Sequence, residues 1–114
     1  MSVKPYVPAR GDVVWINFDP QAGHEHAGRR PAVVLSPTAY NAKVGLALFC
    51  PITSRIKGYP FEAALPPGLA VSGVALADQV KSLDWREREA TFSCSLPSDM
   101  LQRILDRVRL LLAD

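Results

Sequence analysis

The stretch Gly28-Arg29-Arg30-Pro31-Ala32-Val33-Val34 leads from a charged loop into an apolar strand. The residue before a proline is pushed away from helical geometry toward extended backbone, so we expect Arg30 at a strand edge with a fixed direction. A planar guanidinium with five donors matches the oxygens of a phosphate. Because Glu25 and the imidazoles of His24 and His26 come just before it, the segment indicates a phosphate-handling site.

Short apolar segments, bounded by proline and glycine, lie on both sides of this stretch. The chain has 10 prolines and 7 glycines, a spacing that favours short strands over long helices. Apolar residues predict strands over residues 13–18, 32–36, 46–53, 61–65, 74–81 and 90–94. Pro51 within the third of these implies an edge strand or a bulge. The period of two along 74–81 places Gln79 and Lys81 side by side on one surface.

The end of the chain changes to helical spacing. The apolar residues of this segment are Leu101, Ile104, Leu105, Val108, Leu111 and Leu112. Pro97 suits the first turn of such a helix, and Ser95 or Ser98 suits its cap. A single helical turn is also predicted over residues 38–43. The expected fold is therefore mainly β, a small antiparallel barrel or sandwich closed by a C-terminal α-helix.

Length and composition limit what the chain does. Its 114 residues suit one domain, residues 1–114, and 48% apolar with 21% charged residues is an ordinary globular balance. With no apolar run of bilayer length and no signal-peptide core, a cytoplasmic location is expected. A net charge of +2 argues against a non-specific nucleic-acid binder. Cys50 and Cys94 are expected to be buried free thiols.

Each candidate residue also has a plainer interpretation. Arg30 suits a structural salt bridge to Glu25, Asp12 or Asp78. His24 and His26 suit an exposed loop, a weak metal site with Glu25, or proton transfer in a ribonuclease. Thr53, Ser54, Arg55 and Lys57 follow a strand as a phosphodiester-binding edge or as a polar turn. Trp15 and Phe18 suit base stacking if exposed, although core packing is the better expectation for each alone.

Several segments together resemble the MazF/PemK/Kid toxin family, most closely its MazF branch. They are Gly11-Asp12-Val13-Val14-Trp15, Gly28 to Val34, Cys50-Pro51-Ile52-Thr53-Ser54, Lys57-Gly58-Tyr59-Pro60-Phe61-Glu62 and Ala77-Asp78-Gln79-Val80-Lys81-Ser82. They span nearly the whole chain, in order and with compatible spacing. The resemblance implies an SH3-like barrel of the CcdB/PemK type.

The same resemblance implies a toxin of a type II toxin–antitoxin pair that cleaves single-stranded RNA or mRNA at specific sequences, without a metal or other cofactor. It assigns catalysis to Arg30, Thr53 and Glu25. The RNA contacts that it implies, with Arg29 as a further cation, are Asn17, Phe18, Arg29, Ser54, Lys57, Gln79 and Lys81. His24, His26 and Arg29 depart from the usual pattern of the loop.

In the mechanism that the resemblance implies, the ribose 2′-OH attacks the adjacent phosphate and leaves a 2′,3′-cyclic phosphate and a 5′-OH. The implied partners are a second copy of the chain and a MazE-like antitoxin with an extended acidic tail. Two other functions remain open from sequence. One is a CcdB-like gyrase inhibitor; we expect the apolar tail Leu110-Leu111-Leu112 to be packed, which argues against this function. The other is a non-catalytic SH3-like module that binds RNA or a peptide.

Overall fold

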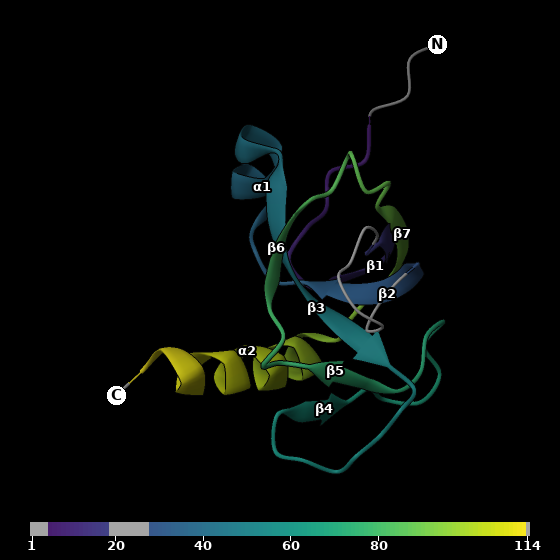
Figure 1. Cartoon of the computed structure of the whole chain (residues 1–114), viewed down its shortest axis with the longest axis vertical. Helices are drawn as coiled ribbons and strands as arrows, with labels where there is room; N and C mark the ends of the chain where they lie inside the picture. The colour runs from purple at the N-terminus through teal and green to yellow at the C-terminus, as the bar shows by residue number, and fades with distance from the viewer. Residues whose placement is uncertain (1–4, 19–27, 114) are drawn as a thin grey trace.

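The computed structural model describes residues 5–18 and 28–113, and its strands pair in an antiparallel sense (Figure 1). In chain order the elements are β1 (Asp12–Asn17), β2 (Arg29–Val34), α1 (Thr38–Val44), β3 (Leu46–Thr53), β4 (Glu62–Ala64), β5 (Val74–Leu76), β6 (Lys81–Asp84), β7 (Thr91–Ser95) and α2 (Ser98–Leu112). The strands join in the order β4-β5-β3-β2-β1-β7, and β6 also pairs with β3. The predicted fold, mainly antiparallel β with a C-terminal helix, is confirmed.

β3 is the central strand: it pairs with β2 along one edge and with both β5 and β6 along the other. Pro51 explains why two separate strands share that second edge. One edge pairs with β2, from Val34–Phe49 to Ala32–Pro51. Leu48 uses its backbone groups on that edge, accepting from the Leu35 N–H and donating to the Ser36 hydroxyl, each at 2.8 Å. Backbone groups alternate along an antiparallel strand, so Pro51 faces the opposite edge, where it has no N–H to donate.

That opposite edge corrects one prediction. Residues 74–81 do not form one strand: β5 pairs with Ile52 and Thr53, β6 pairs with residues 46–49, and the chain turns between them. A hydrogen bond from the Gln79 N–H to the Leu76 carbonyl, at 3.1 Å, closes the turn. It lies opposite Cys50 and Pro51, where the ladder is interrupted. The irregularity that Pro51 predicts is therefore present, and it falls on the partner segment rather than making β3 an edge strand.

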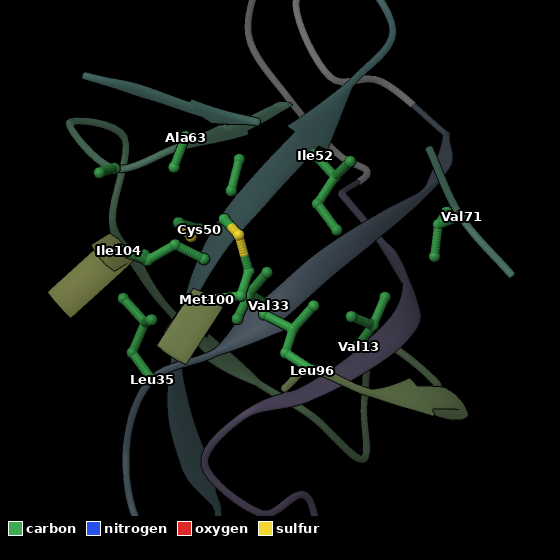
Figure 2. Close-up of a cluster of buried hydrophobic side chains, with 12 residues drawn as sticks. Val13, Val33, Leu35, Cys50, Ile52, Ala63, Val71, Leu96, Met100 and Ile104 are labelled. Carbon is green, nitrogen blue, oxygen red and sulfur yellow. The ribbon is translucent and has the colours of Figure 1, made fainter. Parts of the chain in front are cut away.

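A first hydrophobic core lies between the sheet and α2 (Figure 2). Met100 and Ile104 of α2 are buried there beside Val33 and Cys50, so the helix does lay its apolar stripe on the sheet. Burial raises the pKa of the Cys50 thiol to about 12, which keeps it protonated at neutral pH. Cys94 is also a free thiol, although only half-buried. The predicted serine cap is wrong, because Pro97 occupies the N-cap position.

A second core covers the other face of the sheet. It contains Val14, Ile16, Phe18, Ala32, Val34, Ala47, Phe49, Leu83 and Trp85. At its margin the buried Asn41 side chain receives the Ser36 hydroxyl at 2.6 Å and donates to the Pro8 carbonyl at 2.8 Å. These bonds tie α1 to the segment before β1.

The end of α2 differs from the expectation of a packed tail. Leu110, Leu111 and Leu112 are 69%, 50% and 82% exposed. The packing that argued against a gyrase inhibitor is therefore absent at these three residues. Neither of the helices in the described part of the chain combines the length and apolar content needed to cross a bilayer.

Candidate active site

Arg30 stands in β2, one residue before Pro31, as its sequence context predicts. It pairs with Ile16 of β1, and its side chain is exposed. Side chains alternate across a strand, so Arg30 shares a face with Ala32 and Val34, the face of the second core. The extended geometry that proline imposes thus directs the guanidinium to a defined side of the sheet.

Thr53 ends β3 on the same face. The β2–β3 ladder ends at the pair Ala32–Pro51, and Arg30 and Thr53 each lie two residues beyond that pair at the same end of the ladder. Phe49, four residues before Thr53, belongs to the second core, which fixes the side to which Thr53 points. Two of the three predicted catalytic residues, Arg30 and Thr53, therefore lie near matching ends of neighbouring strands on one face.

The hydroxyl of Thr53 is already oriented. Its Oγ1 accepts the backbone N–H of Arg55 at 3.1 Å, which leaves the hydroxyl proton for another acceptor such as a phosphate oxygen. Gly73 packs directly behind this residue with a φ of +121°. Gly73 was not predicted from the sequence, although the Ser72-Gly73 dipeptide is a turn signal that marks this position.

Lys81 adds a second cation to this face. It lies across from Phe49 in the β3–β6 ladder, and its Nζ lies 5.6 Å from the centroid of the Phe18 ring. A cation over an aromatic face is held by the ring quadrupole. Phe18 is fully buried, so it offers no ring surface to a base and instead supports Lys81 from below. Trp15, for which core packing was expected, is 38% exposed.

The loop after β3 carries Ser54 and Lys57, both exposed. Glu62 of β4 fastens this loop: its two carboxylate oxygens accept the backbone N–H groups of Lys57 and Gly58 at 2.9 and 2.7 Å. Bonds from backbone N–H groups to an ionised carboxylate are among the stronger hydrogen bonds in proteins. Glu62 therefore fixes where Lys57 leaves the sheet.

Tyr59 of the same loop reaches the turn between β5 and β6. Its hydroxyl donates to Oδ1 of Asp78 at 2.7 Å. This hydrogen bond is the main reason that the pKa of Tyr59 is raised to about 12, while a hydrogen bond with the Gln79 side chain lowers it. Gln79, a predicted RNA contact, is thus held at the end of the loop that carries Lys57.

Arg30 forms no salt bridge with Asp12 or Asp78, two of the three carboxylates proposed as its partners. Asp12 accepts the Tyr6 hydroxyl at 2.6 Å and the Ala9 N–H at 3.0 Å, and Asp78 is engaged by Tyr59. Within residues 5–18 and 28–113, the Arg30 guanidinium forms no ion pair or hydrogen bond. As far as these residues are concerned, the guanidinium is therefore available to an external anion.

Asn17 and Arg29 lie elsewhere. They pair with each other across β1 and β2, so their side chains occupy the face opposite Arg30. Glu25, His24 and His26 fall outside the described residues, and no geometry is assigned to them. In the described ranges, no group of three His, Cys, Asp or Glu side chains is placed to hold a metal ion.

Comparison with known proteins gives a consistent result. Residues 9–112 match the family described as PemK-like, MazF-like toxin of type II toxin–antitoxin system. The chain is 51% identical over 110 residues to Endoribonuclease toxin MazF of Escherichia coli K12, covering 96% of this chain and 98% of that protein.

Solved structures agree with the sequence match. The crystal structure of MazF from Deinococcus radiodurans (Form-I) superposes with a TM-score of 0.90 and 56% identity, covering 95% of this chain and 98% of that one. A MazE–MazF crystal structure (Form-II) from the same organism gives a TM-score of 0.85 and 51% identity, covering 95% and 97%.

Proposed function

This chain belongs to the PemK-like, MazF-like toxins of type II toxin–antitoxin systems and is a MazF-like endoribonuclease, and we propose that it cleaves single-stranded RNA, including mRNA, at specific sequences without a metal ion. The observation that carries the proposal is the placement of Arg30 and Thr53 at matching strand ends on one face. An exposed guanidinium and an oriented hydroxyl on one face suit the oxygens of a phosphodiester group.

The proposed reaction is an internal transfer of the phosphoryl group. The ribose 2′-oxygen attacks the adjacent phosphorus and loses its proton to a base, for which Glu25 is the candidate. The bond to the 5′-oxygen breaks, and that oxygen takes up a proton. Arg30 stabilises the charge on the phosphorane oxygens. The Thr53 hydroxyl donates a hydrogen bond to a non-bridging oxygen and so orients the phosphate. The products are a 2′,3′-cyclic phosphate and a 5′-OH.

We assign RNA binding to residues around this pair. Lys81 over Phe18 supplies a cation on the same face, and Ser54 and Lys57 extend from the end of β3. Gln79 presents an amide beside Tyr59 that suits a base edge. Asn17 and Arg29 lie on the opposite face, which favours a role for Arg29 other than RNA binding.

The partners that we propose are a second copy of the chain and a MazE-like antitoxin whose extended acidic tail covers the cationic face. The MazE–MazF complex of Deinococcus radiodurans supports the second assignment by similarity. An acidic segment complements the exposed Arg30 and Lys57 and the half-buried Lys81. A cytoplasmic location follows from an mRNA substrate.

The test uses purified protein, a long RNA and excess EDTA, with sequencing of the cut ends. We expect cleavage at a recurring short sequence, with cyclic-phosphate and 5′-OH ends, and a loss of about 10²-fold in rate for Arg30→Ala. Cleavage by Arg30→Ala at the parent rate would overturn the assignment. RNA that is bound but left intact would identify a binding module, and inhibition of DNA gyrase without RNA cleavage would identify a CcdB-like toxin.

A further inference from the structure

We infer that Arg29 is a positioning residue for the reaction, a strut that locks the strand ends carrying Arg30, and that it does not contact RNA. The inference rests on the proposed function, in which Arg30 acts on the phosphate. Arg29 opens β2 directly before Arg30, so whatever fixes the Arg29 backbone also fixes the direction of its neighbour.

The contacts of the Arg29 guanidinium reach across the sheet. Nη2 donates to the Glu89 carbonyl at 2.7 Å and to Oγ1 of Thr91, in β7, at 2.8 Å. Nη1 lies 3.4 Å from Oδ1 of Asn17, in β1. One planar side chain therefore joins β2 to β1, to β7 and to the turn before β7. Both N–H groups of Nη2 are used inside the protein, on the face opposite Arg30.

The turn at residues 86–90, which accepts the Arg29 hydrogen bond, is held by several further hydrogen bonds. Glu89 has a φ of +54°, a left-handed conformation that is uncommon for a non-glycine residue. Backbone bonds from Glu89 N–H to Arg86 and from Ala90 N–H to Trp85, at 3.0 and 2.9 Å, close the turn. The Glu89 carboxylate also accepts Nδ2 of Asn17 at 3.2 Å. Such a conformation persists where the surroundings hold it, and Arg29 binds its carbonyl.

The same turn grips β1. The Asn17 N–H donates to the Arg88 carbonyl at 3.0 Å, and the Arg88 guanidinium donates to the Asn17 carbonyl at 3.2 Å. Next to this, the Phe18 N–H donates to the Gly28 carbonyl at 3.0 Å, which joins the end of β1 to the start of β2. Arg29, Asn17 and the turn at residues 86–90 thus form one connected unit behind Arg30.

These contacts require a guanidinium rather than positive charge alone. Lysine carries the same charge, but its single ammonium group lacks the planar fork that reaches the Glu89 carbonyl, Thr91 and Asn17 together. A phosphate contact would instead depend mainly on charge, which lysine keeps. Exchange of Arg29 for lysine and for glutamine therefore separates a strut from an RNA contact.

The experiment compares Arg29→Lys, Arg29→Gln and Thr91→Val with the parent, using Arg103→Gln on the exposed side of α2 as the matched control for a lost arginine. Single-turnover cleavage gives the rate. The salt dependence of binding is measured on an RNA with a 2′-deoxy residue at the cleavage site. Amide exchange of Asn17 and Phe18 is measured without RNA.

We expect Arg29→Lys and Arg29→Gln to lose about tenfold in cleavage rate alike, because a slight misplacement of a catalytic group is costly. Thr91→Val should reduce the cleavage rate by a smaller factor. The salt dependence of RNA binding should be unchanged in all variants. Amide protection of Asn17 and Phe18 should fall in both Arg29 variants. The Arg103→Gln control should match the parent.

The inference is overturned if Arg29→Lys cleaves at the parent rate while Arg29→Gln lowers the salt slope by about 0.7, the amount for one lost phosphate contact on a single strand. Unchanged amide protection in Arg29→Lys would overturn it as well. Because the amide measurement needs no RNA, it tests the strut even if the parent fails to cleave RNA. That failure would instead contradict the proposed function.

Discussion

Gly73 packs so closely against the carbonyl oxygen of Thr53 that a Cβ atom at position 73 would clash with it. The backbone of the residue just before β5 therefore packs against the residue that we assign to phosphate binding. Gly73 also has a φ of +121°, which other residues rarely adopt.

Gly73→Ala should therefore lower both stability and activity. We expect a loss of about 1–3 kcal/mol in the free energy of unfolding from the backbone conformation, and a lower cleavage rate because Thr53 must shift. Gly68→Ala is the control: Gly68 has a similar positive φ of +91° but open space around its Cβ position. It should lose stability and keep the parent rate in the folded protein. Equal rates for both variants would disprove the coupling to Thr53.

Glu62 should govern the loop that carries Lys57. Glu62→Gln replaces one of the two carboxylate oxygens that accept the Lys57 and Gly58 N–H groups with an amide donor. We expect a loss of about 1 kcal/mol in stability and a higher KM for RNA, with a smaller change in kcat. Steady-state kinetics measure this, and Glu87→Gln, on an exposed residue, is the control. A kcat effect without a KM effect would contradict the role.

The Tyr59–Asp78 hydrogen bond should make stability depend on pH in the alkaline range. The bond raises the pKa of Tyr59 from 10.0 to about 12 in the folded protein. The neutral phenol is thus favoured on folding, so its stabilisation is complete below pH 10 and is lost between pH 10 and about 12. Tyr59→Phe should lack this loss. Urea unfolding of both proteins across this pH range measures the free energy of unfolding. If it falls equally with pH in the parent and in Tyr59→Phe, the prediction is refuted.

Asn41 should be among the residues least tolerant of substitution outside the site. Its fully buried amide bonds to Ser36 and Pro8, and its backbone carbonyl receives the Trp85 indole N–H at 3.0 Å. Asn41→Leu leaves the Ser36 hydroxyl and the Pro8 carbonyl without this partner, so we expect a loss of about 2–3 kcal/mol. Thermal unfolding against Lys43→Ala, an exposed change in the same helix, measures it. A loss no larger than that of the control would be inconsistent with the bonding described.

Local patterns predicted much of the fold. The apolar run 46–53 matches β3 in both boundaries, and Arg30-Pro31 is extended as the steric effect of proline requires. The helix predicted after Pro97 is confirmed, and its apolar spacing holds up to Val108, since Ile104 is buried in the first core and Val108 packs against it, whereas Leu111 and Leu112 are exposed. These features depend on neighbours in sequence, which is why they are readable without a structure.

Other features depend on partners distant in sequence. The break between β5 and β6 follows from the missing N–H of Pro51 on the neighbouring strand, so the regular alternation of 74–81 conceals it. The burial of Phe18 and the exposure of Leu112 depend on which faces are covered. Arg29 and Arg30 look alike in sequence, yet successive residues of a strand point to opposite faces, and only Arg29 finds Glu89 and Thr91.

The most direct test of the account is a double-mutant cycle of Arg30→Ala and Thr53→Val, read as the single-turnover rate of cleavage of one defined RNA. Two groups that bind the same phosphate act as a unit, so we predict that the double variant loses little more than Arg30→Ala alone. Effects that multiply independently, or a parent-like rate in either single variant, would contradict the shared site.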